Sequence, residues 1–191
     1  MPKRTIITLG GMPGSGKSTI REMLATQLGY KTFSTGNFTR HLAKERGITL
    51  QEMNEIVAKD KALEMRIDAE LERIEAEENN IIVDSHLAFH FVPSSFKVYF
   101  DISLDEATRR IFNDTGAKLR VESGDIMETL EATKERTLAR IENHRSRYKE
   151  HYGLNPYDGS QYDLVVNTEE SDPEAITDAV VAGYKKWLKD E

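Results

Sequence analysis

Short apolar runs and longer amphipathic segments alternate along the chain, and this alternation predicts strands and helices in turn. The run Thr5–Leu9 is made of β-branched and aliphatic residues and stops at two glycines, which is typical of a buried strand. In Lys17–Leu28 the apolar residues recur at helical spacing, and Gly29 follows in the position of a helix terminator. The same reasoning predicts four more strands, at Tyr30–Phe33, Asn80–Asp84, Phe96–Phe100 and Tyr162–Val166.

Helical patterns fill most of the chain between these strands. Thr49 and Glu52 form a capping box, so a helix is expected to begin at Leu50. Asn113–Asp125 has no steady period, which predicts a loop or a mobile flap. The expected helices are Phe38–Arg46, Leu50–Ala58, Lys61–Glu78, Leu104–Phe112, Pro173–Leu188 and a long stretch over Ile126–Tyr152 with room for a break. Such alternation implies an α/β fold in one domain over residues 1–191, with helices on both faces of a five-stranded parallel sheet.

Composition and charge narrow the class of protein. Apolar residues make up 38% and charged residues 31% of the 191 residues, as in a globular protein. The formal charge of −7 disfavours a polymeric nucleic acid as partner, although local basic clusters stay possible binding sites. The absence of cysteine excludes disulfides and thiolate metal sites. The start MPKRTIITLGG has too short an apolar run for a signal peptide, so we expect a cytoplasmic monomer without a membrane partner.

A glycine-rich stretch between the first strand and the first helix carries the clearest chemistry. Gly11, Gly16, Lys17 and Ser18 satisfy the pattern G-x-x-x-x-G-K-[ST]. Glycines let backbone N–H groups turn towards phosphate oxygens, and the following helix points its positive end at the same anion. Lys17 would reach the β- and γ-phosphates of ATP, and the Ser18 hydroxyl would ligate Mg²⁺. The residues expected to hold ATP are Gly11, Met12, Pro13, Gly14, Ser15, Gly16, Lys17, Ser18 and Thr19.

Two further features are candidate metal ligands, a carboxylate and a pair of histidines. Asp84 ends an apolar strand, which suits a carboxylate that holds Mg²⁺ directly or through water, and the alternative is an Asp that caps a turn. His86 and His90 are four residues apart, but the sequence offers them no third ligand. We therefore expect these histidines to pack or to contact the acceptor of the phosphoryl group.

Arginines outside the loop indicate a second anionic molecule. Arg40 follows a turn after the second strand, where a planar cation would clamp an acceptor phosphate. Arg136, Arg140 and Arg147 lie at spacings of four and seven on an expected helix, and so would project from one side of it. The alternative is a surface of ordinary solvated arginines. Since the chain has no N-K-x-D motif of GTPases, these features favour a kinase for a small acceptor.

Several stretches together resemble the nucleoside monophosphate kinases, most closely the short archaeal type of cytidylate kinase. They are ITLGGMPGSGKST, FSTGNFTRHLAKERGITLQEMN, IIVDSHLAFHFVPSSFKVYFDISLDEATRR and SRYKEHYGLNPYDGSQYDLVVNT, and they span nearly the whole chain. The resemblance implies a P-loop kinase fold of three layers, α/β/α. It also implies a helical acceptor-binding insertion over about residues 34–78 and a mobile lid over about residues 112–147.

The resemblance also implies roles for individual residues. The loop and Lys17 would bind ATP, Ser18 and Asp84 would handle Mg²⁺, and Arg110 would stack on the adenine. Catalysis would rest on Lys17 and on the lid arginines Arg140 and Arg147, which close over the phosphates. The residues expected to bind the acceptor are Ser34, Arg40, His86, Arg136, Arg140, His144 and Arg147.

The chain departs from the family pattern on the acceptor side. Asn37 stands where the family has an Asp, and Ser85-His86 stands where it has a Gly-Arg pair. His144 replaces an acid that contributes to reading cytosine in relatives. The resemblance implies CMP or dCMP as the first expectation for the acceptor, and because of these departures AMP, another nucleotide, a coenzyme precursor or a shikimate-like acid stay open. A non-catalytic nucleotide-dependent switch is the third alternative.

Overall fold

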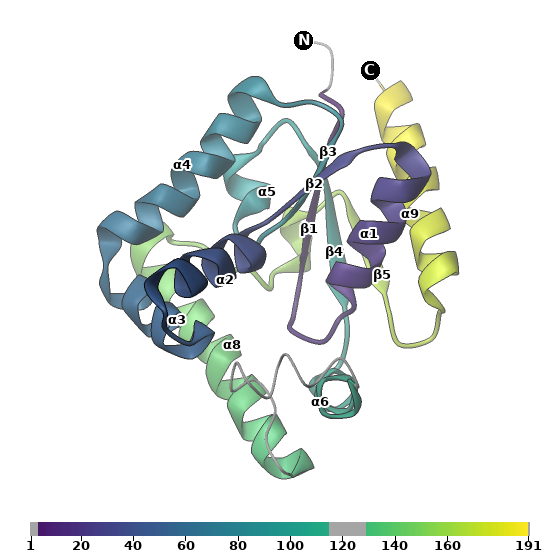
Figure 1. The fold of residues 1–191 in the computed structure, drawn as a ribbon. Helices are drawn as coiled ribbons and strands as arrows, with labels where there is room; N and C mark the ends of the chain where they lie inside the picture. Colours follow the sequence, from purple (N-terminus) through teal and green to yellow (C-terminus); the bar gives the residue numbers. More distant parts are fainter. Residues whose placement is uncertain (1–3, 115–128, 191) are drawn as a thin grey trace.

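A parallel β-sheet forms the middle of the structure, a computed structural model that describes residues 4–114 and 129–190. The sheet has five strands in the order β2-β3-β1-β4-β5, and all four pairings are parallel. This confirms the expected α/β fold (Figure 1). The strands are β1 Ile6–Gly11, β2 Lys31–Ser34, β3 Ile81–Asp84, β4 Phe96–Asp101 and β5 Leu164–Asn167.

Helices cover both faces of the sheet, because side chains of a strand alternate between its faces. Ile7 and Leu9 of β1 pack towards α1 and α9, whereas Ile6 packs towards α4 and α5. Both faces of β1 are buried, which explains its unbroken apolar run. The helices are α1 Lys17–Leu28, α2 Thr35–Arg46, α3 Leu50–Lys59, α4 Lys61–Glu77, α5 Ala88–Phe91, α6 Leu104–Asn113, α8 Leu130–Tyr152 and α9 Pro173–Lys189, with a 3₁₀ turn η1 over Gly159–Gln161.

Helices α2, α3 and α4 form a small helical unit beside the sheet. Their own apolar cluster contains Leu42, Met53 and Leu63, which are separate from the two clusters on the sheet. The expected capping box is present, since Glu52 accepts from the Thr49 N–H at 2.7 Å and donates its own N–H to the Thr49 hydroxyl at 3.2 Å. This unit covers most of the segment expected to bind the acceptor.

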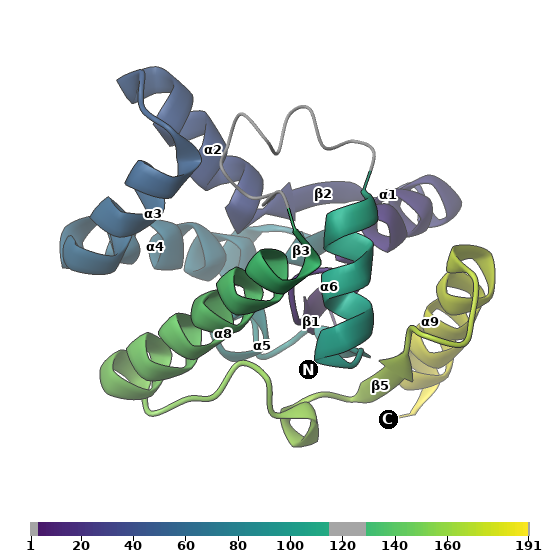
Figure 2. The same cartoon turned by 90° about the horizontal axis from the view of Figure 1, so that it is seen from below.

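The carboxyl ends of the strands face the remaining helices. Seen from below in Figure 2, α8 and α6 lie across this edge of the sheet, and α2 lies beside it. In an open parallel sheet, ligands bind outside the carboxyl ends of the strands. The fold therefore brings the glycine-rich loop, the start of α2 and the helix α8 to one edge. None of the helices in residues 4–114 and 129–190 is long and apolar enough to cross a membrane.

The structure also corrects several element boundaries. Helix α2 begins at Thr35 and not at Phe38, because the Ser34 side chain accepts from the N–H of Asn37 and caps the helix there. Helix α8 runs without a break to Tyr152 and is capped by Thr129. The short helix α5 was not expected. Most of the expected Asn113–Asp125 flap, which belongs to the expected lid, lies outside the described residues, as do positions 126–128.

Candidate active site

The loop between β1 and α1 has a backbone that only glycine tolerates at two positions. Gly11 has φ 135° and Gly14 has φ 83°. A Cβ atom at Gly11 would lie 2.5 Å from the carbonyl oxygen of Phe100, and one at Gly14 would lie 2.6 Å from that of Ala107. Both distances are far inside van der Waals contact. The loop is therefore packed against β4 and α6 in the shape of a cradle, as the motif predicts.

Helix α1 presents its amino end to this cradle. Its N-cap is Gly16, which has no side chain to accept from the first N–H groups. The Lys17 ammonium folds back over the loop and donates to the carbonyl oxygens of Gly11 at 2.8 Å and Met12 at 2.7 Å. Burial lowers the pKa of Lys17 to about 8, although the Asp84 carboxylate opposes this shift. Free N–H groups and a cation beside them fit the phosphates of a nucleotide.

Asp84 lies at the carboxyl end of β3, between its neighbours in the sheet. It is in register with Leu9 of β1 and with Ser34 of β2. Its Oδ2 lies 3.3 Å from Nη1 of Arg21, which is itself only 6% exposed and also donates to Glu22. This Arg21–Asp84 pair joins α1 to β3.

The residues expected to hold Mg²⁺ fit this metal. Ser18 is exposed at the start of α1, and Ser18 and Asp84 both offer the hard oxygen donors that Mg²⁺ prefers. The described residues contain no group of three His, Asp or Glu side chains that would hold a metal by themselves. Mg²⁺ commonly keeps waters and substrate phosphates as its other ligands, so two protein ligands are enough for a magnesium site.

Arg21 is a residue that the sequence analysis missed. It stands next to Ile20, in the buried stripe of α1 that also contains Leu24. A charged residue in an apolar stripe needs a partner when the helix packs on the sheet. A charged residue within the apolar stripe could have predicted a buried ion pair. The identity of its partner, Asp84, follows only from the fold.

The start of α2 brings two expected acceptor residues together. Ser34 caps the helix, and Nη1 of Arg40 donates to Oδ1 of Asn37, which lies in the same turn. Asn37, noted above as a departure from the family pattern, thus positions Arg40. The arginine is exposed, and this turn follows directly from the edge of the sheet where Asp84 ends β3.

His86 and His144, the two histidines expected to depart from the family pattern, are in contact. The rings of His86 and His144 have centroids 4.4 Å apart, although the residues come from the segment after β3 and from α8. Nδ1 of His144 lies 2.8 Å from the hydroxyl of Tyr157, a buried residue that was not expected at the site. Tyr157 also approaches the His86 ring, at 5.7 Å between centroids.

The electrostatic surroundings keep both imidazoles neutral. Burial is the main cause that places the pKa of His86 and of His144 well below the usual value of 6.5. The positive charges of Lys17, Arg140 and Arg147 lower both pKa values further. A neutral imidazole has one donor and one acceptor nitrogen. The pair can therefore form directed hydrogen bonds but does not replace the permanent charge of an arginine.

The arginines of α8 differ in their surroundings. Nη2 of Arg147 donates to the hydroxyl of Tyr148 at 2.9 Å, and its guanidinium carbon lies 4.7 Å from the centre of that ring. Arg140 is close enough to lower the pKa values of Lys17 and His144 by its charge. Arg136 lies one helical turn before Arg140, and its role stays a prediction. Helix α8 thus carries Arg140 towards the Lys17 side of the site.

Arg110 is anchored between α6 and the segment after β5. Its Nε donates to Glu106 at 2.8 Å and its Nη2 donates to the carbonyl oxygen of Thr168 at 2.6 Å. The guanidinium plane is therefore held in one orientation and is partly exposed. This suits the expected stacking on adenine, which stays a prediction.

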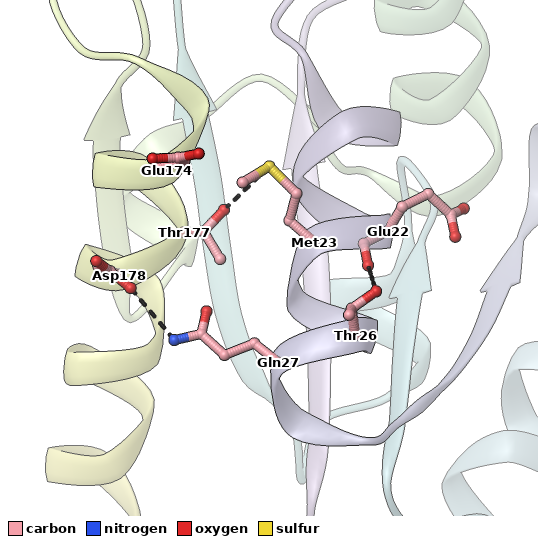
Figure 3. Close-up of a pocket in the computed structure, with 7 residues that line it drawn as sticks. All are labelled: Glu22, Met23, Thr26, Gln27, Glu174, Thr177 and Asp178. Atoms are coloured by element: carbon pink, nitrogen blue, oxygen red, sulfur yellow. Dashed lines mark hydrogen bonds between the residues drawn. The ribbon is translucent and has the colours of Figure 1, made fainter.

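A separate groove of about 530 Å³ lies between α1 and α9 (Figure 3). Three of its lining residues, Glu22, Glu174 and Asp178, carry carboxylates, and its polar groups already bond to each other, as when Gln27 donates to Asp178. A phosphate chain would be repelled here. None of the expected site residues lines this groove.

The chain is similar to several known proteins in sequence and in fold. The chain matches the family described as an AAA domain over residues 10–151. It is 34% identical to the cytidylate kinase of Halobacterium salinarum, over 92% of this chain and 87% of that protein. It is 30% identical to an S-adenosylmethionine-dependent nucleotide dehydratase of Lacinutrix mariniflava, over 96% of this chain and 36% of that protein. The solved shikimate kinase of Acinetobacter baumannii has the same fold, with a TM-score of 0.59 at 15% identity over 100% of this chain and 97% of that one.

Proposed function

The chain belongs to the cytidylate kinase family and is a nucleoside monophosphate kinase, and we propose that it transfers the γ-phosphoryl group of ATP to CMP or dCMP. One observation carries the proposal. The glycine cradle with Lys17 lies at the same sheet edge as a second group of cationic and polar side chains, which includes Arg40 and Arg140. This arrangement supports separate sites for a phosphate donor and an anionic acceptor at one edge of the sheet.

The donor side would hold the triphosphate through the backbone. The N–H groups of the loop and of the first turn of α1 would donate to the phosphate oxygens, and the Lys17 ammonium would move from the carbonyl oxygens of Gly11 and Met12 to the β- and γ-phosphates. Ser18 and Asp84 would hold Mg²⁺, which neutralises charge on the β- and γ-phosphates. Arg110 would support the adenine.

The reaction needs positioning more than acid–base chemistry. An oxygen of the acceptor monophosphate attacks the γ-phosphorus, the bond to the β,γ-bridging oxygen breaks, and ADP leaves with that electron pair. The acceptor is already an anion, so no strong general base is required. Lys17, Arg140 and Arg147 would offset the negative charge that spreads over the transferring group.

Both cationic and neutral polar side chains would bind the acceptor. Ser34 and Arg40 would bind the monophosphate, with Arg136 as a further cation. His86 and His144 would contribute neutral donors and acceptors next to Tyr157. The match to a nucleotide dehydratase supports a nucleotide as the acceptor, although that match covers about a third of the relative (36%).

An acceptor screen tests this proposal. The protein is incubated with ATP, Mg²⁺ and one of CMP, dCMP, UMP, AMP or GMP, and the diphosphate products are resolved. We expect the highest kcat/KM for CMP or dCMP. Bound ATP without any diphosphate product would refute this proposal, and a higher kcat/KM for UMP, AMP or GMP would favour a kinase with a different nucleotide acceptor.

The histidine contact favours one alternative, a kinase of the same architecture whose acceptor differs from CMP. His86→Arg distinguishes the two cases, because it restores a permanent cation at the position where the family has one. If CMP is the natural acceptor, the KM for CMP should fall about tenfold, which corresponds to one charge-assisted hydrogen bond. An unchanged or higher KM for CMP would support a different acceptor.

A further inference from the structure

Glu64 of α4 is a buried carboxylate that contacts the last third of α8. The residue is 5% exposed. Its Oε2 lies 2.6 Å from Nδ1 of His151, and its Oε1 lies 3.4 Å from Nε of Arg147. Burying a carboxylate costs free energy unless partners compensate for the lost water. His151 and Arg147 therefore offset the cost of burying the Glu64 carboxylate.

The contact with Arg147 is incomplete as a hydrogen bond. Both Oε1 of Glu64 and Nε of Arg147 are buried, and neither has a hydrogen-bond partner among the described residues. The ion pair at 3.4 Å places these two atoms face to face, so a small shift of α8 would complete the bond. Buried polar atoms without a hydrogen-bond partner are rare in folded proteins, and a role in catalysis is one explanation for them.

The guanidinium of Arg147 is held on three sides. Glu64 faces its Nε edge, the Tyr148 hydroxyl accepts from Nη2, and the Tyr148 ring lies under its plane. The described part of the chain supplies no hydrogen bond to Nη1. This edge is available to a phosphate oxygen, and its direction is fixed by the other contacts.

Charge supplies a second reason for a carboxylate here. Lys17, Arg140 and Arg147 each lie close enough to His86 and His144 to lower the pKa values of both histidines, and Arg140 also lowers that of Lys17. These like charges repel each other in the protein without ligand. Glu64 pairs with Arg147, the second of these two arginines on α8, and it comes from the helical unit expected to bind the acceptor.

We propose that Glu64 is a positioning residue that aims Arg147 at the transferring phosphoryl group. The inference rests on the proposed function, since it assigns a support to an arginine of that site. A flexible arginine loses rotamer freedom when it binds a phosphate, and a side chain that is already ordered avoids part of that cost. Glu64 would thereby tie the position of the acceptor-binding helices to that of the arginine on α8.

Glu64→Gln tests the proposal, because it removes the charge while keeping the shape of the side chain. We expect kcat with CMP to fall about tenfold and the KM for ATP to stay the same, since the loop is untouched. In the Arg147→Ala background, Glu64→Gln should have no further effect on kcat. An equal loss of kcat in both backgrounds would overturn the proposal.

Asp68→Asn is the matched control. Asp68 lies one turn after Glu64 on α4 and also contacts α8, where the Tyr152 hydroxyl donates to it at 2.5 Å, but it interacts with Arg147 only through longer-range charge. We expect its kcat to stay within about twofold of the wild type. If Asp68→Asn lowers kcat as much as Glu64→Gln does, the effect is general helix docking and the proposal is wrong. Glu64→Asp, which keeps the charge on a shorter side chain, replaces Glu64→Gln if the latter does not fold.

Affinity for a bisubstrate compound, adenosine and cytidine joined through five phosphates, gives a readout without turnover. Calorimetry should show about tenfold weaker binding to Glu64→Gln and unchanged binding to Asp68→Asn. Equal affinity of the wild type and Glu64→Gln would overturn the positioning role while leaving the kinase function intact. A wild-type protein that neither binds this compound nor phosphorylates any acceptor would instead refute the proposed function, and this inference with it.

Discussion

The two halves of the candidate site are built in different ways. The donor half is centred on a continuous stretch of backbone, in which Gly11 and Gly14 approach neighbouring carbonyl groups too closely for any other residue. The acceptor half consists of side chains from α2, from the segment after β3, from α4 and from α8. In the first half the chain path itself forms the site, whereas in the second the path only brings separate side chains together.

This difference would account for the position of the expected departures from the family pattern, which all fall in the acceptor half. Replacing one residue in the loop would disturb the packing against β4 and α6 as well as phosphate binding. A side chain of the acceptor half can change while the backbone stays in place. His86 and His144 share one ring contact and one charged environment, so we expect a substitution of either histidine to affect the other.

The largest expected effect is on the donor half. Lys17→Ala should lower kcat by a factor on the order of 10³, because the buried ammonium that is expected to contact the phosphates is lost. Steady-state kinetics with ATP and CMP measures this. Lys97→Ala is the control, since Lys97 also donates to two carbonyl oxygens, those of Pro93 and Ser95, but on β4. A similar loss in both variants would mean that Lys17 acts through the fold alone.

Gly14→Ala should have the next largest effect. The new Cβ would meet the carbonyl oxygen of Ala107, so the loop must move and the affinity for ATP should fall at least about tenfold. Gly29→Ala is the matched variant, because Gly29 has φ 68° and open space around it. It should cost about 1 kcal/mol of stability and leave ATP affinity unchanged. Calorimetric titration with ATP measures the affinity of both variants, and urea unfolding measures their stability.

Arg40→Ala should affect the acceptor half only. Because Arg40 is expected to bind the acceptor phosphate, its loss should raise the KM for CMP about tenfold and leave the KM for ATP as it is. Arg46→Ala, on the last turn of the same helix, serves as the control. If the KM for CMP is the same in Arg40→Ala and the wild type, Arg40 does not contribute to this half of the site.

The smallest expected effect concerns pH and stability. The pKa of His144 is lowered in the folded protein, mainly by burial and then by Arg140, Arg147 and Lys17, so the unfolded chain binds more protons near its usual pKa of 6.5. The free energy of unfolding should therefore fall as the pH drops below 6.5, by up to about 1.4 kcal/mol per pH unit from this residue.

His144→Asn tests this by removing the titrating group while retaining a side chain that can bond to Tyr157. Urea unfolding at pH 7.5 and 5.5 should show a smaller loss of stability in the variant than in the wild type. His41, which is exposed on α2, provides the control variant His41→Asn. Parallel slopes in the wild type and His144→Asn would show that His144 is not the buried group that titrates.

Much of the fold could be predicted from the sequence because its signals are local. Buried parallel strands give apolar runs such as Ile81–Asp84, and the Thr49 cap marks its helix within four residues of chain. The errors were local as well. The Ser34 cap was missed, so α2 was expected to begin too late, and the four residues of α5 are too few for a helical period to show.

The sequence by itself determined the strand and helix order and the glycine loop with Lys17, since spacing and backbone preference act between near neighbours. Only the tertiary structure decided that Arg21 pairs with Asp84, that His86 meets His144 and that Glu64 faces Arg147. The members of each pair are far apart in the chain. Their contact depends on how helices pack on the sheet, and the protonation of the histidines depends on the burial and charge that this packing creates.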